Sequence, residues 1–286
     1  MAMQSPSPFA GLRGDYSRMN ADWTVSQDPR AYSAAEQDIW RTLLRRQSGL
    51  ARQHGCPEFL AGLTRLDIDE RIPDFARVSD MLERRTGWRV IGVPGLIPDD
   101  AFYGHLAQRR FPVTVWIRKR EELDYLVEPD LFHDFFGHVP LLAEPVFADY
   151  MQAYGQRGVE AGAANVHRLA RLYWYTVEFG LVRSGAGLKV FGAGIISSAK
   201  ETLYAMGSPL PARVPFNARR VMRTAYEIDK LQRTYFVLDD FRQLFDATRV
   251  DFTPLYAELA GLPEIATGTV LPDERPLSVT PLPQAA

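Results

Sequence analysis

Two histidines five residues apart are the side chains of this sequence best suited to chemistry. His133 and His138 lie in the segment VEPDLFHDFFGHVP, which also carries acidic residues. About forty residues later, the run YWYTVEFG carries Glu178. Two imidazoles and one carboxylate are the ligand set of non-haem Fe(II) oxygenases, in which the metal keeps open positions for O2 and a reductant. These residue types predict a metal site at His133, His138 and Glu178.

The spacing of the histidines constrains the local backbone. In a regular helix, residues i and i+5 point about 140° apart, so both histidines face one ion only if the helix ends between them. Gly137 and Pro140 predict that end, because glycine tolerates a left-handed turn and proline does not continue a helix. At the other end, Pro129 suits the first helical position and Asp130 suits the positive end of the helix dipole.

Glu178 lies in a long apolar run, AANVHRLARLYWYTVEFGLV, that predicts a buried helix. Ala170, Trp174 and Glu178 fall on one stripe of this helix, at i, i+4 and i+8. Buried acids are rare unless they are paired, hydrogen-bonded or bound to a metal. We therefore favour a metal ligand over a buried salt bridge, and expect Trp174 to line the same cavity.

Two other interpretations of the histidines compete with an iron site. Each histidine alone fits an ordinary polar position on an amphipathic helix, although the neighbouring Phe132, Phe135 and Phe136 make an apolar setting in which imidazoles need partners. Two histidines and a glutamate also bind catalytic zinc. The H-E-x-x-H spacing of zinc proteases is absent, because Asp134 follows His133 and the second histidine comes one position late.

Four segments together closely resemble the pterin-dependent aromatic amino acid hydroxylases, and most of all their bacterial members. They are residues 128–130, 133–140, 173–180 and 192–198, in order and with compatible spacing within a likeness that covers about 88 to 245. The resemblance implies a mainly α fold with a few short β-strands, forming a single catalytic domain of this family. It also implies Fe(2+) bound by His133, His138 and Glu178, and a tetrahydropterin cofactor, either tetrahydrobiopterin or a bacterial equivalent.

The resemblance further implies a pterin pocket. The loop VPGLIP, which alone is typical of an ordinary strand-to-helix turn, is expected to wrap the pterin with backbone groups, since glycine allows a close approach. Asp134 stands where animal members have glutamate. The expected pterin contacts are Val93, Gly95, Leu96, Ile97, Phe102, which would stack on the ring, Asp134, Ala170 and Tyr173.

On the substrate side, Arg118 is expected to end an apolar strand and to grip an amino acid carboxylate with two hydrogen bonds. The alternative is an exposed arginine at a strand end. Leu126 and Val127 replace a Thr-Pro pair that contacts substrate in animal members, so the sequence leaves open how the amino acid is anchored at this edge of the substrate site.

Trp174 favours a phenylalanine or tyrosine hydroxylase, because tryptophan hydroxylases carry Phe at the corresponding position. The expected substrate contacts are Arg118, Pro129, Trp174, Gly194 and Ser197.

The expected reaction is hydroxylation of L-phenylalanine to L-tyrosine with O2 and a tetrahydropterin, which a carbinolamine dehydratase acting in sequence would recycle. Within the family, hydroxylation of tyrosine, of tryptophan or of the meta carbon of phenylalanine stays open. Outside it, the alternatives are a zinc hydrolase and a non-catalytic metal-bound amino acid sensor.

Composition excludes some classes of function. Lys and Arg total 33 against 35 acidic residues, so no net positive field favours nucleic acid. No apolar run reaches eighteen residues, and the N-terminus lacks the apolar core of a signal peptide. The single cysteine, Cys56, forms no intramolecular disulfide. We expect a cytoplasmic enzyme without membrane or nucleic-acid partners, and a monomer, because the likeness is to the catalytic core alone.

We divide the 286 residues into a polar N-terminal tail at 1–30, a catalytic domain at 31–261 and a proline-rich tail at 262–286. Within the domain, Ser33 and Glu36 form a capping box that opens a helix towards His54. The other expected helices lie near 57–65, 73–85, 100–110, 129–137, 143–157, 163–183, 195–206, 217–231 and 239–247. The expected strands lie at 88–92, 113–118 and 188–191.

Overall fold

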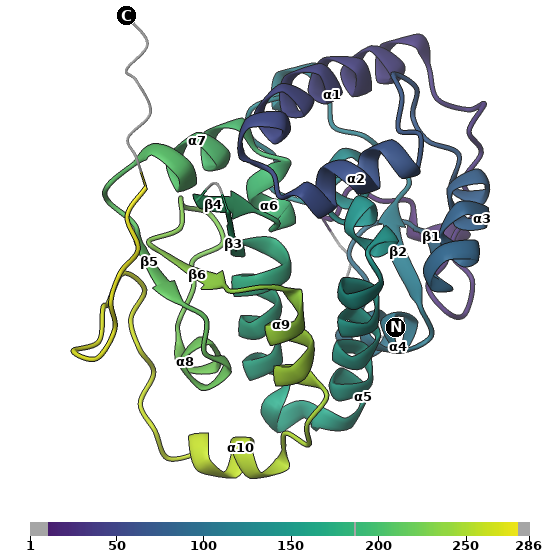
Figure 1. The fold of residues 1–286 in the computed structure, drawn as a ribbon. Helices are drawn as coiled ribbons and strands as arrows, with labels where there is room; N and C mark the ends of the chain where they lie inside the picture. The colour runs from purple at the N-terminus through teal and green to yellow at the C-terminus, as the bar shows by residue number, and fades with distance from the viewer. Residues whose placement is uncertain (1–10, 186, 280–286) are drawn as a thin grey trace, which may run out of the picture.

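The computed structural model describes residues 11–185 and 187–279, and this part of the chain is mainly helical (Figure 1). The α-helices are α1 (Ala34–His54), α2 (Pro57–Arg65), α3 (Phe75–Thr86), α4 (Asp99–Ala107), α5 (Pro145–Tyr173), α6 (Ala193–Ile196), α7 (Ala199–Gly207), α8 (Ala218–Arg223), α9 (Phe241–Thr248) and α10 (Thr253–Leu259). The 3-10 segments are η1 (Tyr16–Arg18), η2 (Arg120–Glu122) and η4 (Val139–Ala143), and the π-helical segments are η3 (His133–His138) and η5 (Trp174–Glu178). The expected mainly α fold is confirmed.

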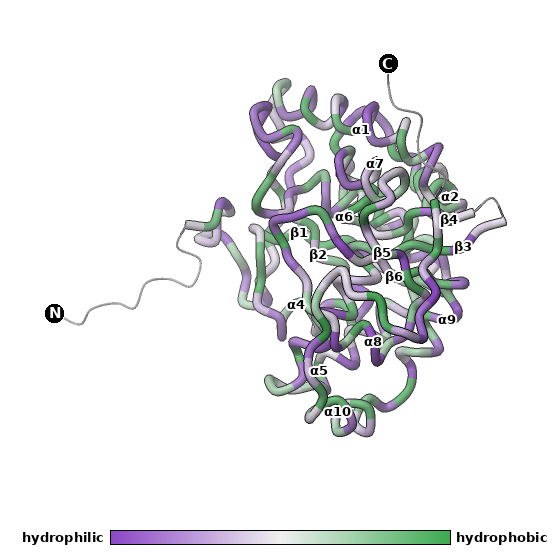
Figure 2. Tube along the Cα trace, turned by 90° about the vertical axis from the view of Figure 1, so that its left-hand side faces the viewer, coloured by the Kyte–Doolittle hydropathy of each residue, from purple (hydrophilic) through white to green (hydrophobic). Residues whose placement is uncertain are grey.

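Two small sheets lie apart in the molecule, as both views show (Figures 1 and 2). One pairs β1 (Arg89–Val93) with β2 (Arg110–Thr114) in parallel. The other has the order β4-β3-β6-β5, in which β3 pairs antiparallel with β4 and β6 pairs parallel with β3 and β5. Its strands are β3 (Leu181–Ser184), β4 (Gly187–Val190), β5 (Ala212–Pro215) and β6 (Thr234–Leu238).

Local sequence signals explain where the early helices begin and end. Ser33 Oγ accepts from the Glu36 N–H, and the Glu36 carboxylate accepts from the Ser33 N–H at 2.8 Å, so the predicted capping box is present. Helix α3 begins after Asp74, whose side chain accepts from two backbone N–H groups, and ends at Gly87 in a left-handed conformation (φ 75°).

An aromatic cluster fixes the segment that carries the two histidines. Phe132, Phe135 and Phe136 are fully buried. Phe132 stacks on Phe136 with a centroid distance of 4.9 Å and meets Trp40 of α1 edge-on at 5.4 Å. Phe136 also meets Phe59 of α2 edge-on at 5.5 Å. Because three aromatic side chains anchor this segment in the core, the positions of the neighbouring histidines are fixed as well.

The long helix α5 is interrupted at Gly162, whose φ of 63° and ψ of 170° are not helical. This break agrees with the two separate helices predicted at 143–157 and 163–183. The second one ends earlier than predicted: regular helix stops at Tyr173, π-helix continues to Glu178, and Leu181 already belongs to β3.

Other predicted boundaries are wrong in detail. The strand predicted at 113–118 lies at Arg110–Thr114, and the helix predicted at 195–206 is divided at Ser197 and Ser198 into α6 and α7. Only Ala218–Arg223 of the helix predicted at 217–231 is helical. The sequence patterns also missed β3, β5, β6 and α10.

The segments outside the predicted catalytic domain bind to its surface where the structure describes them. The Val25 N–H donates to Gly92 O of β1 at 2.9 Å, and the Leu277 N–H donates to Arg213 O of β5 at 2.7 Å. Residues 1–10 and 280–286 of the two predicted tails lie outside the described residues. The division into tails and catalytic domain stays a prediction.

Hydrophobic and hydrophilic residues are interleaved along the helices (Figure 2). Among the described residues, no helix combines the length and the hydropathy needed to cross a membrane.

Candidate metal centre

Both histidines lie on the π-helical segment η3, His133–His138. In a π-helix the hydrogen bonds join residues i and i+5, so residue i+5 lies above residue i. The predicted helix end between the histidines is therefore wrong: the backbone winds on through Gly137 to His138 and continues as η4, with Pro140 in its first turn. Wider winding, rather than a stop, brings the two imidazoles together.

Gly137 has a different role from the predicted one. It does not have a positive φ angle. A Cβ at this position would lie 2.9 Å from Ala193 Cβ, which is closer than real Cβ contacts, and 3.2 Å from Ala193 O, which is tight. The glycine therefore permits η3 to pack against α6.

Glu178 ends a second π-helical segment, η5, in which the Phe179 N–H donates to Trp174 O at 2.9 Å. The preceding residues flank the carboxylate. Tyr173 lies beside His138, with a centroid distance of 6.1 Å. Burial, and then the charge of Glu178, raise the pKa of Tyr173 well above its usual value.

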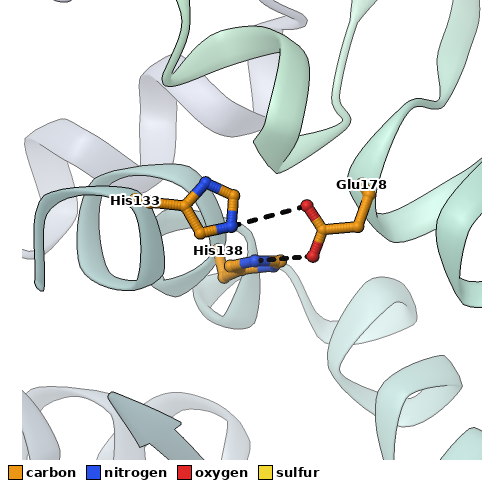
Figure 3. Close-up of side chains that lie close together, drawn as sticks. All are labelled: His133, His138 and Glu178. Carbon is orange, nitrogen blue, oxygen red and sulfur yellow. Dashed lines mark ion pairs between the residues drawn. The ribbon is translucent and has the colours of Figure 1, made fainter. Parts of the chain in front are cut away.

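The three predicted ligands face one another (Figure 3). His133 Nε2 lies 3.5 Å from Glu178 Oε2, and His138 Nε2 lies 3.2 Å from Glu178 Oε1. One ligand atom from each residue can be chosen so that all three lie within 4.8 Å of one another. The structure thus brings together the three residues that residue type and motif indicated, although the backbone between the histidines differs from the one that their spacing predicted.

The donor set fits a divalent cation. His133 Nδ1 lies 2.9 Å from Ser197 Oγ, and in the tautomer whose Nδ1–H donates to that hydroxyl, Nε2 carries a free lone pair directed at Glu178. A lone pair beside a carboxylate is unfavourable unless a proton or a cation lies between them. Nitrogen and oxygen ligands of this kind suit Fe(II) as well as zinc, so the cluster alone does not choose the metal.

The pKa shifts of the two carboxylates at the site, Glu178 and Asp134, have opposite directions. Burial raises the pKa of Glu178, but the nearby imidazoles of His138 and His133 oppose it and bring the pKa below the usual glutamate value. Burial also raises the pKa of Asp134, and here the imidazole of His133 and a 2.8 Å hydrogen bond from the Thr114 N–H do not offset it. The site therefore favours an ionised Glu178 and disfavours a second negative charge at Asp134.

Two of the predicted pterin contacts, Phe102 and Tyr173, lie next to each other beside this cluster. Phe102 meets Tyr173 edge-on at 5.6 Å, and Tyr173 in turn borders His138. The Ala170 carbonyl accepts from the Trp174 N–H one turn earlier in the helix. Val93 ends β1, and Gly95, Leu96 and Ile97 follow it in the loop before α4.

Neighbouring segments hold that loop in place. The Trp116 indole N–H donates to Pro94 O at 3.0 Å, and the Tyr16 hydroxyl donates to Leu96 O at 2.9 Å. A Cβ on Gly95 would lie 2.9 Å from Tyr16 Oη, so glycine permits this approach. The N-terminal segment thus forms part of the loop's surroundings, which the sequence patterns did not indicate.

Arg118 differs from its predicted setting. It lies beyond the end of β2 and is buried, which excludes the exposed strand-end alternative. Its Nε and Nη2 donate to the two carboxylate oxygens of Asp130 at 2.9 and 2.8 Å. Burial alone would raise the pKa of Asp130, but the guanidinium outweighs it and the pKa is lowered. This partner was missed, because no sequence pattern indicates a pair twelve residues apart across a loop.

The remaining predicted substrate contacts lie on segments that meet at the cluster. Pro129 precedes Asp130, and Ser197 follows α6 and contacts His133. A Cβ on Gly194 would lie 2.8 Å from Phe179 Cζ and 3.1 Å from Glu178 O, so glycine lets the Phe179 ring close over this region. Trp174 packs against Phe179 at 4.7 Å. Phe179, which packs on Trp174 and lies close to Gly194, is a residue of this region that sequence reasoning missed.

Known proteins that resemble this chain belong to one family. Residues 18–253 match the family model described as biopterin-dependent aromatic amino acid hydroxylase. The chain belongs to this family. A phenylalanine-4-hydroxylase from Ralstonia nicotianae is 54% identical over 263 residues, which cover 91% of this chain and 83% of the relative.

Two solved structures of the Chromobacterium violaceum phenylalanine hydroxylase are similar throughout. One, with bound iron(III) and the oxidised cofactor 7,8-dihydrobiopterin, has a TM-score of 0.87 at 49% identity and covers 96% of this chain and 100% of that one. The other, with bound iron and phenylalanine, has a TM-score of 0.86 at 50% identity and covers 94% and 97%. The family expected from the sequence motifs is confirmed.

Proposed function

We propose that this hydroxylase converts L-phenylalanine to L-tyrosine with O2 and a tetrahydropterin at a mononuclear Fe(II) site. The observation that carries the proposal is the facing arrangement of His133, His138 and Glu178 in a chain of this family. Relatives that share about half of its residues are phenylalanine hydroxylases, and their structures hold iron, dihydrobiopterin and phenylalanine. These relatives support phenylalanine over tyrosine and tryptophan as the substrate.

His133, His138 and Glu178 would hold the iron. When bound, the iron and the tetrahydropterin together supply the redox chemistry that reduces O2 and hydroxylates the aromatic ring. Ser197 orients the His133 ring through Nδ1, and a metal ion on Nε2 would select the tautomer whose Nδ1–H donates to the Ser197 hydroxyl. Because both histidines lie on one π-helical turn packed in an aromatic core, the ligands are held before any metal binds.

The protein's other contribution is placement. Asp130 occupies two N–H donors of Arg118 and leaves its remaining donors for an amino acid carboxylate. Phe102 and Tyr173 offer aromatic surface for a pterin beside His138. Phe179 and Trp174 offer aromatic surface for the substrate ring and exclude water from the reacting groups. No side chain needs to act as a nucleophile.

The proposal includes a monomeric enzyme in the cytoplasm. Transfer of one oxygen atom of O2 to the substrate and the other to the pterin leaves a pterin carbinolamine, which a dehydratase acting in sequence would convert for recycling. Size-exclusion chromatography with light scattering tests the monomer, and a coupled assay with a carbinolamine dehydratase tests the recycling step.

The deciding experiment is an assay of Fe(II)-reconstituted protein with tetrahydropterin and O2, in which Phe, Tyr and Trp are offered separately and products are identified by mass. We expect para-tyrosine from Phe as the preferred product. Replacement of His133 or His138 by Ala should abolish turnover through loss of iron, measured by metal analysis. A different hydroxylated product would overturn the substrate, and no pterin oxidation by folded, iron-loaded protein would overturn the monooxygenase in favour of a zinc hydrolase or a sensor.

A further inference from the structure

Trp174, a proposed substrate contact, is held between two aromatic rings. Tyr226 stacks on its indole with a centroid distance of 4.6 Å and an interplanar angle of 21°. Phe179 packs on it at 4.7 Å, and the tip of Phe179 reaches the backbone of Gly194 beside Glu178. Two of these rings, Trp174 and Phe179, come from the segment that carries Glu178, whereas Tyr226 comes from the loop between α8 and β6.

The same loop also determines the orientation of the indole. The Trp174 Nε1–H donates to Gln232 Oε1 at 2.9 Å. The amide nitrogen of Gln232 donates to Glu227 O and Lys230 O, both at 2.9 Å. Since both amide donors are used by carbonyls, the oxygen can only face the indole. The Gln232 side chain is buried, and its three hydrogen bonds define one geometry for Trp174.

A buried carboxylate fixes Gln232 in turn. The Gln232 N–H donates to Glu201 Oε1 at 3.1 Å, and the Tyr235 hydroxyl donates to the same oxygen at 2.5 Å. Glu201 is 6% exposed and lies on α7, directly after the Ser197 and Ser198 turn. Hydrogen bonds thus run from α7 through Gln232 to the N–H edge of the Trp174 indole.

We propose that Gln232 is a positioning residue for amino acid binding, and that it acts by fixing the Trp174 indole against the place of the substrate ring. The inference rests on the proposed function, because it takes Trp174 as a substrate contact. It adds the loop between α8 and β6 to the proposed substrate site. In this loop, Tyr226 stacks on the Trp174 indole and Gln232 accepts its N–H. A pterin would bind on the Tyr173 side in this arrangement, so we expect Gln232 to affect binding of the amino acid and not of the pterin.

The test compares Gln232→Met, which keeps the length of the side chain and removes its hydrogen bonds, with Gln37→Met as the matched control. Gln37 Oε1 likewise accepts one neutral N–H, in this case the backbone N–H of Ile72 at 2.9 Å, but it lies on α1. Loss of one neutral hydrogen bond corresponds to about a 2- to 10-fold effect. We expect Gln232→Met to weaken L-phenylalanine binding, measured by calorimetry, and to raise its KM by roughly this factor.

Two further readouts separate positioning from simple loss of stability. We expect fewer tyrosines formed per tetrahydropterin oxidised in Gln232→Met, with an unchanged KM for the pterin, and neither effect in Gln37→Met. In a double-mutant cycle, Gln232→Met should add little in a Trp174→Phe background, because that variant already lacks the indole N–H.

The outcomes are distinct. Unchanged phenylalanine binding and coupling in folded Gln232→Met would overturn the inference, as would a full effect that persists in the Trp174→Phe background. If the wild-type protein binds phenylalanine but does not hydroxylate it, the proposed function fails, while the binding measurement still decides the role of Gln232. If the wild type does not bind phenylalanine at all, both fail.

Discussion

The carboxylate of Asp130 is the most heavily used acceptor beside the candidate metal centre. It is fully buried and accepts hydrogen bonds from Arg118 N, Nε and Nη2 and from His133 N. In a buried pair, the Coulomb attraction is largely offset by the cost of desolvation. Its main effect here is therefore geometric: one carboxylate sets both the direction of the Arg118 guanidinium and the start of the turn that carries His133.

Replacement of Asp130 by Asn tests this view at the level of one residue. The variant leaves the Arg118 charge buried without its partner, so we expect a loss of about 3–5 kcal/mol in the free energy of unfolding and a higher KM for phenylalanine. Urea unfolding and steady-state kinetics measure the two effects. Asp239→Asn, at an exposed pair with Arg183, is the control and should be close to neutral. A stable Asp130→Asn with unchanged KM would contradict the assigned role.

Glu201 predicts a specific dependence of stability on pH. Burial raises its pKa above the usual glutamate value of 4.5, and the hydrogen bonds from Tyr235 and Gln232 only partly oppose this. Between 4.5 and the raised value, the folded state binds more protons than the unfolded state, so stability falls as pH rises through this window. Glu201→Gln keeps an oxygen acceptor and removes the charge, so its stability advantage over wild type should grow from pH 4.5 to pH 7.5.

Melting temperatures of both proteins across this pH range measure the effect. Glu70 provides a control of opposite sign, because its hydrogen bond and ion pair with Arg45 lower the pKa of its exposed carboxylate. Above pH 4.5, Glu70→Gln should be slightly less stable than wild type, because it lacks the ion pair with Arg45. This difference in stability should become smaller as the pH falls and Glu70 of the wild type becomes protonated. Parallel curves for wild type and Glu201→Gln would contradict the prediction for Glu201.

At the scale of elements, the two π-helical segments determine the site. A π-helical turn contains more residues than an α-helical turn and makes no extra hydrogen bonds. It is therefore stable only where the surrounding packing fixes it. Here η3 is held by the aromatic cluster and by its contact with α6, and η5 contacts α5, α6 and β6. Packing, rather than helix propensity, sets the ligand geometry.

Gly137→Ala tests the contact between η3 and α6. The added Cβ would lie 2.9 Å from Ala193 Cβ, and overpacking of this kind costs about 1–3 kcal/mol. Since His138 is the next residue, we expect weaker Fe(II) or Co(II) binding as well as a lower melting temperature. In the control Gly104→Ala on α4, the new Cβ meets nothing within 4 Å, so this variant should be neutral or slightly stabilised. Equal metal affinity in the two variants would exclude the proposed coupling.

Sequence patterns predicted the elements whose ends are set by neighbouring residues. The capping box of α1 lies within four consecutive residues, and the bounds of α2 match those predicted. By contrast, β5 and β6 are four- and five-residue strands whose pairing joins segments about twenty residues apart, so their short runs carried too little local pattern to be predicted as strands. The histidines and the glutamate were found by type and motif, whereas the π-helical winding was not, because only tertiary packing selects it.

At the scale of the whole molecule, the candidate centre joins two parts of the fold. His133 and His138 belong to the turn surrounded by α1, α2 and α3, and Glu178 belongs to the segment that leads from α5 into the four-stranded sheet. The contacts of the Glu178 carboxylate with Nε2 of the two histidines cross this junction. A metal ion bound by all three would therefore connect the two parts, and its binding energy would appear as stability of the whole chain.

Metal binding should accordingly raise the melting temperature by mass action. A ligand at 100 times its Kd stabilises the folded state by about 2.7 kcal/mol, which in a chain of this size corresponds to a shift of roughly 5 °C. We expect this shift when Fe(II) or Co(II) is added anaerobically to the metal-free protein, and its reversal by a chelator. Glu178→Gln supplies the control, because it keeps the shape of the side chain but loses the anionic ligand, and its melting temperature should hardly respond to metal. If wild type and Glu178→Gln respond equally, the stabilising metal binds elsewhere and the centre does not connect the two parts of the fold.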